Sequence, residues 1–330
     1  YRCLSPAVVV SIWALLSRLQ MLRHIVRHLP LVFGLIAVPL SAQTSANIFA
    51  VCEYSSQQCI DQIDPEIAKA DPKSARWYEL TLLKLDTLFA LQYDEPLWQA
   101  TSKLVLDQTS PASFRARIYI YHAKMLSSKG SKLQAEHYLD KAVKLLESLN
   151  RSAPNPLTTI RLVNVQTYVG GDPLVGYETL QKLEAQFSRS HDELMKYDLY
   201  NNLGHGAHFL KRLEESQQHR EKALIAIQKT TNKAKLAEGH YNLARVMAYR
   251  GLWVDAEPHL VHAEGYYHEI GDQLLTALAR MHLAESLYRQ GKTEAAATMF
   301  ATVDISKIPE YAADHLTRIS ALFAPSKSAS

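Results

Sequence analysis

Five positions about forty residues apart limit what this chain can fold into. Gly130, Gly171, Gly251 and Gly291 occupy four of them and Lys211 the fifth, so the successive intervals are 41, 40, 40 and 40 residues. Small or near-small residues recur at fixed distances from these positions. Seven residues before them lie Ala123, Asn164, Gly204, Ala244 and Ala284; five after, Ala135, Gly176, Ser216, Ala256 and Ala296; and twelve after, Ala142, Leu183, Ala223, Ala263 and Val303. A period of this length indicates stacked helical hairpins.

The small residues and the glycines each have a physical reason to recur. Two antiparallel helices approach to about 8 Å only where the side chains at their crossing are small. A glycine ends the first helix because a left-handed residue satisfies the last carbonyls without a Cβ clash. We therefore expect the turn at Lys211 to be strained or differently shaped.

The composition favours an all-α fold. The 330 residues include only 12 glycines and 13 prolines, so long stretches lack the residues that interrupt a helix. With 47% hydrophobic and 21% charged residues, the chain has the composition of a folded protein.

The repeats need a cover at each end, because an uncapped array of hairpins exposes core. Residues 75–92 and 95–108 have the pattern of a further, divergent hairpin, and Pro309 opens a last amphipathic helix. We expect about six hairpins and a C-terminal capping helix within residues 75–324, followed by a loose tail over 325–330.

The stretch YNLARVMAYRGLWVDAEPHLVHA, residues 241–263, resembles the tetratricopeptide repeat family. Leu243, Ala244, Gly251, Ala256 and Ala263 fall at that family's leucine, small, glycine and alanine landmarks. The forty-residue period is similar to the longer variety found in MalT-type regulators. The resemblance covers residues 116–303 and implies a right-handed solenoid whose first helices line a concave face.

The same resemblance implies that the chain binds a peptide or a partner protein on that face. Asn202 and Asn242 match the family's asparagine that holds a bound peptide's backbone, and Arg161 and Arg245 would pair with carboxylates. The binding residues predicted from the register are Arg161, Tyr168, Asn202, His205, Tyr241, Asn242, Arg245, Tyr249, Glu285 and Arg289.

Residues 21–42 have the pattern of a secretory signal peptide. Two arginines precede an apolar run over residues 29–40, and small residues follow, with cleavage expected at Ala42 or Ala46. The apolar run is shorter than the roughly 20 residues of a membrane-spanning helix. We therefore expect a periplasmic or secreted protein that contacts a membrane only through an uncleaved leader. We interpret residues 1–20 as an over-extended or fragmentary start.

The net charge of +3 belongs to this leader. Residues 1–42 hold four arginines and no acidic residue, which leaves 32 basic and 33 acidic residues in the rest of the chain. The balance gives no electrostatic reason to expect a nucleic-acid partner.

Cys52 and Cys59 lie in the predicted N-terminal segment, residues 43–74. A continuous helix would hold their Cα atoms about 10.5 Å apart, beyond the roughly 7 Å that a disulfide tolerates. Either the bond forms and the residues around Ser55 make a turn, or the helix is intact and the thiols are free. We favour the bond, which would close an eight-residue ring and stabilise the fold by about 2.5 kcal/mol.

Catalytic motifs are not evident. The segment SLYRQGKT, residues 286–293, ends like a phosphate-binding loop, but Ser286 replaces the first glycine and no strand precedes it. His205, His208, His259, His262 and His268 have no accompanying metal-site spacing. We therefore expect no catalytic residue, metal or cofactor. A sensory or regulatory module of a signalling system is the alternative, and a metal-dependent enzyme that uses the histidines is the third.

Overall fold

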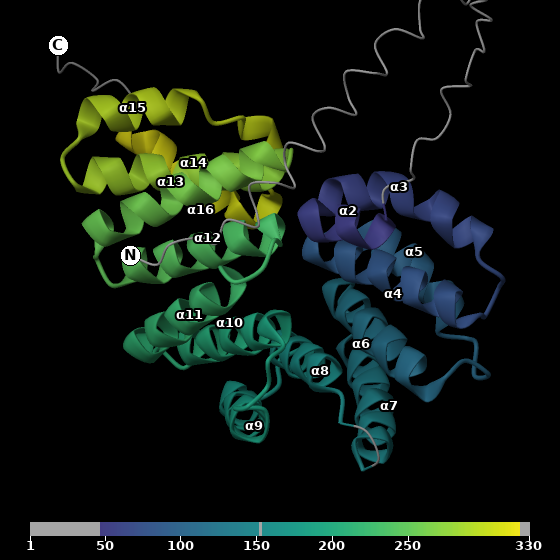
Figure 1. Ribbon diagram of the computed structural model, residues 1–330. Helices are drawn as coiled ribbons and strands as arrows, with labels where there is room; N and C mark the ends of the chain where they lie inside the picture. The colour runs from purple at the N-terminus through teal and green to yellow at the C-terminus, as the bar shows by residue number, and fades with distance from the viewer. Residues whose placement is uncertain (1–46, 152–153, 324–330) are drawn as a thin grey trace, which may run out of the picture. The chain divides into compact units, whose positions relative to one another are not determined.

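The computed structural model describes residues 47–151 and 154–323, and within these ranges the secondary structure is helical (Figure 1). Six antiparallel hairpins follow one another along the chain. Their helix pairs are α4 (Ala75–Ala90) with α5 (Asp94–Leu104), α6 (Ala112–Ser128) with α7 (Lys132–Asn150), α8 (Pro156–Tyr168) with α9 (Pro173–Gln186), α10 (Glu193–Phe209) with α11 (Leu213–Ile227), α12 (Lys233–Tyr249) with α13 (Trp253–Glu269), and α14 (Gln273–Arg289) with α15 (Thr293–Ala301). The predicted all-α array of about six hairpins is confirmed.

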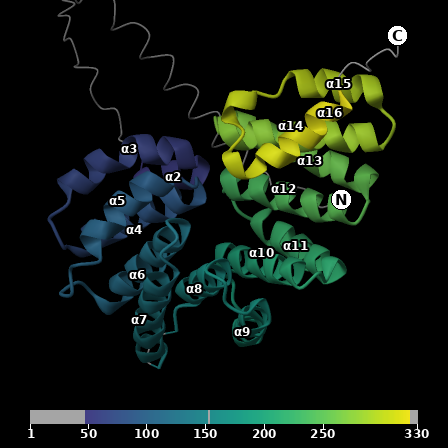
Figure 2. The same ribbon diagram turned by 180° about the vertical axis from the view of Figure 1, so that it is seen from behind.

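Further helices flank the hairpins. Two helices precede them, α2 (Ile48–Tyr54) and α3 (Ser56–Lys69). After α15 come two short 3-10 turns, η2 (Ile305–Lys307) and η3 (Glu310–Ala312), and then α16 (Ala313–Leu322), which packs against α14 (Figures 1 and 2). Ile319 of α16 is buried in the same core as the last hairpins, so α16 is the predicted capping helix.

The small residues mark the places where the two helices of a hairpin cross. Ala123, Ala244 and Ala284 have no exposed surface, and the same holds for their counterparts Ala135, Ala256 and Ala296. The α10–α11 pair uses Gly204 and Ser216 instead, and the Ser216 hydroxyl donates to the Gly204 carbonyl oxygen at 2.7 Å.

The turns within the hairpins follow one pattern. Gly130, Gly251 and Gly291 have φ values of 79°, 78° and 79°, and Lys211 adopts the same left-handed conformation with φ 63°. The N–H of Leu252 donates to the Met247 carbonyl, which closes the turn after Gly251 in the way typical of helix C-termini. The turn at Lys211 is therefore not differently shaped; the alternative expectation of strain holds, because a residue with a Cβ occupies a position suited to glycine.

The predicted register is wrong by one residue in α8. The left-handed residue of the α8–α9 turn is Gly170, with φ 101°, whereas Gly171 donates its N–H to the Gln166 carbonyl at 2.8 Å. This turn holds one extra residue before α9 begins. The crossing position of α8 is therefore Val163 and not Asn164, and a Cβ on Gly176 of α9 would meet the Val163 side chain at 3.1 Å.

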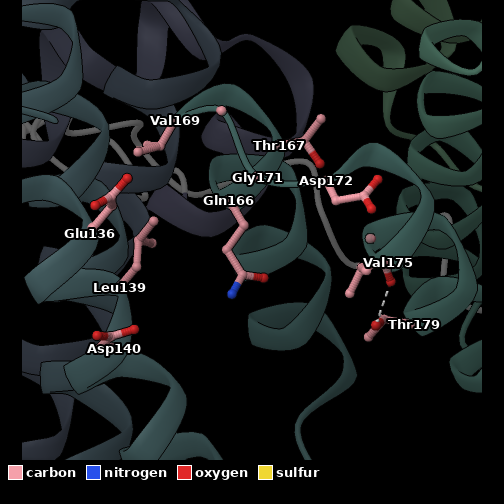
Figure 3. A pocket seen from close by; sticks show the side chains of 12 residues that line it. Glu136, Leu139, Asp140, Gln166, Thr167, Val169, Gly171, Asp172, Val175 and Thr179 are labelled. Carbon is pink, nitrogen blue, oxygen red and sulfur yellow. Dashed lines mark hydrogen bonds between the residues drawn. The ribbon is translucent and has the colours of Figure 1, made fainter. Parts of the chain in front are cut away.

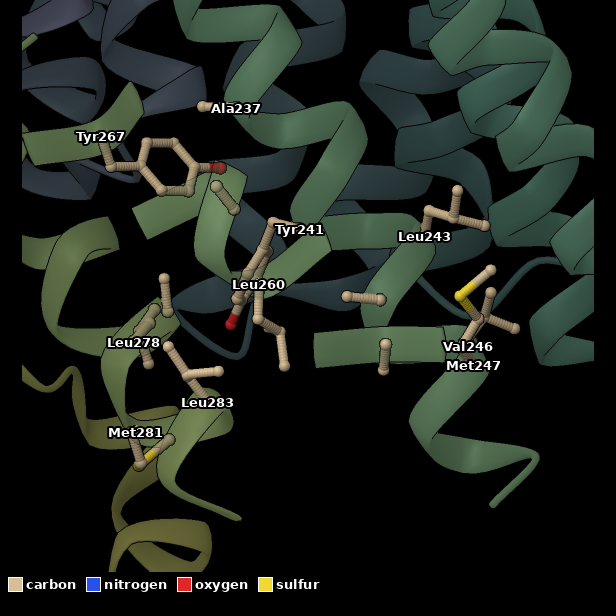
Figure 4. Close-up of a cluster of buried hydrophobic side chains, with 14 of the residues drawn as sticks. Ala237, Tyr241, Leu243, Val246, Met247, Leu260, Tyr267, Leu278, Met281 and Leu283 are labelled. Atoms are coloured by element: carbon tan, nitrogen blue, oxygen red, sulfur yellow. The ribbon is translucent and has the colours of Figure 1, made fainter. Parts of the chain in front are cut away.

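The core runs along the array between first and second helices. Its largest cluster joins the last three hairpins and α16, where Leu260, Leu278 and Leu283 pack together (Figure 4). A second cluster joins α4 to α8, and smaller ones lie in α8–α10 and in α2–α4. Each hairpin thus completes its core against the next one, as expected for stacked repeats.

The segment that precedes the hairpins confirms the predicted Cys52–Cys59 disulfide and the break at Ser55, and it forms two helices that the sequence pattern did not predict. Ser55 has an extended backbone that separates α2 from α3, and the Cα atoms of Cys52 and Cys59 lie 4.5 Å apart and are joined by a disulfide. Helix α2 contacts α12, and the Ser55 hydroxyl donates to the Ile270 carbonyl at 2.9 Å. The N-terminal helices therefore meet the fifth hairpin.

The predicted signal peptide and the start over residues 1–20 lie outside the described residues, as does the tail over 325–330. Among the helices that the structure describes, none has the length and apolar character needed to cross a membrane.

Candidate functional site

The first helices of successive hairpins carry the predicted binding residues. Helix α8 contacts both α6 and α10, and α12 contacts α14. Hydrogen bonds from Asn201 to Glu238 and from Asn242 to Asn201 connect α10 with α12. We call the surface formed by these helices, α6, α8, α10, α12 and α14, the inner face.

Arg161 belongs to a partly buried ion-pair network rather than to a free binding surface. Its guanidinium lies 3.1 Å from the Asp86 carboxylate and donates to the Tyr121 hydroxyl at 2.8 Å. Arg117 and Tyr121 contact the same carboxylate. Burial opposes ionisation of Asp86, but the charges of Arg117 and Arg161 outweigh it and lower the Asp86 pKa. The prediction that Arg161 meets a partner's carboxylate is corrected, because its carboxylate comes from α4.

Tyr241 also departs from the predicted surface. Its side chain is buried and belongs to the same cluster as Tyr267 (Figure 4), with the two ring centroids 6.2 Å apart. The Tyr241 ring centroid lies 5.6 Å from that of His282. Burial raises the pKa of the Tyr241 hydroxyl. Tyr241 therefore supports the face from within the core instead of offering a contact surface.

Asparagine side chains connect α8, α10 and α12. The Asn164 amide donates to Asn202 at 2.8 Å, and Asn202 in turn donates to the Asp198 carbonyl at 2.7 Å. Asn242 donates to Asn201 at 3.2 Å. Both predicted asparagines, Asn202 and Asn242, are thus partly engaged with neighbouring repeats, which fixes the orientation of their amides.

Arg220 reaches the inner face from a second helix. A Cβ on Gly204 would lie 2.8 Å from Cγ of Arg220, so the glycine provides the space in which the arginine side chain crosses α10. The Arg220 guanidinium donates to Asn201 at 2.6 Å. The repeat register does not single out Arg220, because the resemblance assigns the binding face to first helices and Arg220 lies on the second helix α11. The glycine in place of the usual alanine, opposite an arginine four residues after Ser216, was the available signal.

Arg245 lies next to Arg220 and has no carboxylate partner. Among the described residues, no carboxylate lies within ion-pair distance of either guanidinium, although the charge of Glu238 acts on Arg220, and the Arg245 Nε is buried without a hydrogen-bond partner. The Arg245 guanidinium carbon lies 5.6 Å from the centre of the Tyr241 ring. Burial, followed by the charge of Arg245, lowers the Arg220 pKa to about 10.

Two histidines of α10 complete this cluster. Burial, and then the charges of Arg220, His208 and Arg245, lower the His205 pKa to about 4. Burial and the same two arginines lower the His208 pKa. His205 is therefore neutral at pH 7 and adds no positive charge to that of the two arginines. We call Arg220, Arg245, His205 and His208 the basic cluster.

Of the remaining predicted binding residues, Tyr249 lies beside the basic cluster. Tyr249 is 60% exposed, and its ring centroid lies 4.9 Å from that of His208. Tyr168, 56% exposed, lies on α8 and shares a hydrogen bond with Ser128 at 3.2 Å. Glu285 and Arg289, on α14, lie 3.5 Å apart. The predicted set is therefore divided, with His205, Arg245 and Tyr249 brought together and Tyr168, Glu285 and Arg289 on other repeats.

A separate cavity of about 300 Å³ lies where α7, α8 and α9 meet (Figure 3). Glu136, Asp140 and Asp172 contribute carboxylates, and Leu139 and Val175 contribute apolar surface. None of the predicted binding residues lines it, and no described basic side chain does.

The segment SLYRQGKT has the structure of a hairpin turn. Gly291 is the left-handed residue between α14 and α15, and the Lys292 N–H donates to the Leu287 carbonyl. Lys292 pairs with Glu257 at 2.7 Å. The backbone amides are used within the turn, so the segment does not form a phosphate-binding loop.

Comparison with solved structures identifies the type of fold. No protein-family model matches the sequence, and no curated protein does. A Rap protein complexed with competence and sporulation factor has a TM-score of 0.56 at 12% identity, over 82% of this chain and 76% of that one. The apo form of RapI has a TM-score of 0.56 at 11% identity, over 75% and 71% of the two chains. The fold is tetratricopeptide-repeat-like.

A third solved structure is also similar to this chain. A putative kinesin light chain of Podosopora anserina with nearly identical TPR-like repeats reaches a TM-score of 0.48 at 14% identity, over 64% of this chain and 95% of that one.

Proposed function

We propose that this chain is a non-catalytic scaffold that binds a peptide or partner-protein segment on the inner face, with a ligand carboxylate held by Arg220 and Arg245. The observation that carries the proposal is the pair of neighbouring guanidiniums without an ion-pair partner among the described residues. By contrast, Arg117, Arg161 and Arg280 pair with acidic residues of the chain itself.

The energetics favour an anionic ligand. Burying an unpaired charge is unfavourable, and a second like charge nearby adds repulsion. A carboxylate placed between the two arginines would remove both costs and accept charge-assisted hydrogen bonds, each worth about 1.5–3 kcal/mol. The neutral His205 and the exposed ring of Tyr249 would then flank the ligand.

Fold likeness supports a peptide as the carrier of this carboxylate. One of the similar structures is a Rap protein complexed with competence and sporulation factor. The oriented amides of Asn202 and Asn242 lie on the same face as the basic cluster and would bind an extended backbone. The left-handed turn residues recur at 130, 170, 211, 251 and 291, which supports assignment to the long, forty-residue repeat variety of MalT-type regulators.

Selection from random peptides tests the proposal. Peptides with free carboxyl termini would be selected on the full chain, and the affinity of one selected peptide measured by fluorescence polarisation. We expect Arg245→Ala to weaken binding at least about tenfold, as loss of a charged hydrogen bond predicts. Arg245→Lys should restore part of the affinity because it keeps the charge but loses the planar fork.

Arg280→Ala is the matched control, because Arg280 pairs with Glu264 at 2.7 Å and takes no part in the basic cluster. Equal binding by wild type, Arg245→Ala and Arg220→Ala would contradict the proposed carboxylate site. Selected peptides without any required carboxylate would do the same.

We also propose that the protein is exported, with a signal peptide over residues 21–42. The Cys52–Cys59 disulfide supports this location, since such bonds persist in oxidising compartments. Mass spectrometry of the protein recovered from the periplasmic or extracellular fraction tests it. A mature chain that begins at Gln43 or Asn47 is expected, and an uncleaved chain confined to the cytoplasm would refute it.

A further inference from the structure

We propose that His282, Glu285 and His315 form a binding site for one divalent first-row transition-metal ion, for which Zn²⁺ is the test ion. His282 and Glu285 lie on α14, three residues apart and thus on one helix face. His315 comes from the capping helix α16. The three side chains are partly buried and offer two imidazole nitrogens and a carboxylate oxygen.

The geometry is close to that of a bound ion. The three ligand atoms all lie within 4.8 Å of one another. Two ligands of one tetrahedral zinc ion, each at about 2.1 Å, lie about 3.4 Å apart, so side-chain adjustments of up to roughly 1.4 Å bring the set together. Two imidazoles and a carboxylate are also a donor set that zinc uses in proteins.

The charges around the three residues permit a cation. Glu285 uses its two oxygens separately: Oε2 lies 2.8 Å from His315 Nε2, whereas Oε1 lies 3.5 Å from Arg289. A metal ion would replace the proton between Glu285 and His315, and Arg289 would keep its contact with Oε1. The positive charge of Arg245 acts on His282 and opposes the ion, whereas the Glu285 carboxylate favours it.

The position of the site defines what the ion would do. The His282 and His315 rings lie 4.6 Å apart, so α14 and α16 already meet at these residues. A bound ion would connect the capping helix to the last hairpin and stabilise its docking. Three protein ligands also leave a coordination position for water or a ligand group.

A second group of histidines serves as the comparison. His240 and His259 approach to 2.9 Å through their Nδ1 atoms, and the His262 ring stacks on His240. The His262 Nδ1, however, contacts the Pro258 carbonyl oxygen at 2.7 Å and is engaged there. No carboxylate shares this group's hydrogen bonds among the described residues, so we assign the ion to the first set.

Cobalt substitution tests the site directly. The full chain is freed of metal with a chelator and titrated with Co²⁺, whose visible absorption reports coordination by nitrogen and oxygen, and Zn²⁺ is then added in competition. We expect one equivalent of Co²⁺ and its displacement by Zn²⁺. His315→Ala and Glu285→Gln should each weaken Co²⁺ binding at least about tenfold. Loss of a residue that only hydrogen-bonds to a metal ligand already weakens metal affinity by about that factor.

His262→Ala is the matched control and should bind Co²⁺ as the wild type does. Circular dichroism of each variant shows whether it is folded, and Glu285→Gln keeps the side-chain shape if His315→Ala does not fold. Zn²⁺ should also raise the unfolding temperature of the wild type but not of Glu285→Gln. The inference is overturned if the wild type takes up no Co²⁺, or if His262→Ala loses binding while Glu285→Gln retains it.

Discussion

The hydroxyl of Ser55 donates a hydrogen bond to the carbonyl oxygen of Ile270 at 2.9 Å, across 215 residues of sequence. Ser55 has no exposed surface, and it also accepts the Gln58 N–H at the start of α3. Nearby, Lys233 and Glu269 form an ion pair, and the Lys233 ammonium lies 5.5 Å from the Tyr54 ring centre. The Ser55 side chain thus caps α3 and also holds the N-terminal helices against the fifth hairpin.

Ser55→Ala should destabilise the fold by about 1–3 kcal/mol, because it removes a helix cap and leaves a buried carbonyl unsatisfied. Urea unfolding measures the change, and hydrogen exchange of α2 should become faster. Ser188→Ala is the control, since Ser188 donates to the Ala185 carbonyl at an exposed site. An equal loss of unfolding free energy in both variants would show that the Ser55–Ile270 hydrogen bond does not stabilise the fold more than an exposed one does.

Reduction of the Cys52–Cys59 disulfide should lower the free energy of unfolding by about 2.5 kcal/mol, since the bond closes an eight-residue ring in the unfolded chain. Denaturation of the Cys52→Ser/Cys59→Ser double variant, with and without a reducing agent, measures the effect. The wild type should respond to the reducing agent and the double variant should not. A response of both proteins would locate the effect elsewhere.

Lys211→Gly should stabilise the protein by roughly 1 kcal/mol, because the left-handed conformation is unfavourable for a residue with a Cβ. Lys211 is exposed, and its φ of 63° lies near those of the glycines in the equivalent turns. Thermal unfolding gives the change, and Lys211→Ala is the control, since it retains the Cβ. A gain of the same size for alanine would attribute the effect to the lysine charge instead.

Stability should fall as the pH decreases from about 6.5 to 4. Burial lowers the pKa of His122 to about 4, and burial followed by neighbouring positive charges does the same for His205 and His240. The unfolded chain therefore binds more protons than the folded one in this range, so the free energy of unfolding rises with pH there and is fully retained above about 6.5. Urea unfolding at several pH values measures the slope, and His122→Gln should make it shallower. A slope unchanged by this variant would exclude His122 as a contributor.

Much of the fold follows from local chemistry that is visible in the sequence. A small residue at Ala123 or Ala244 reports a helix crossing, and a glycine such as Gly251 reports a left-handed turn, because each requirement is met within one hairpin. The register failed at Gly170 and Gly171 because either glycine fits that turn, and only the backbone hydrogen bonds distinguish them.

The binding face was harder to predict, since it depends on partners that lie far apart in sequence. Arg161 meets Asp86 across 75 residues, and no spacing rule connects them. Tyr241 and Arg245 share a helix and differ in exposure because of what the neighbouring hairpins place beside them. The N-terminal helices escaped detection for a similar reason, as their packing depends on contacts such as Ser55 with Ile270.

The glycine at position 204 shows why repeats of one protein cannot be exchanged freely. Three equivalent places in other hairpins hold alanine, and a comparison of the repeats alone would suggest alanine here too. Because Gly204 has no methyl group, the Arg220 side chain has room to cross α10 at this point. An alanine at position 204 would make this hairpin more like its neighbours. Its methyl group would nevertheless clash with Arg220 and displace the arginine side chain.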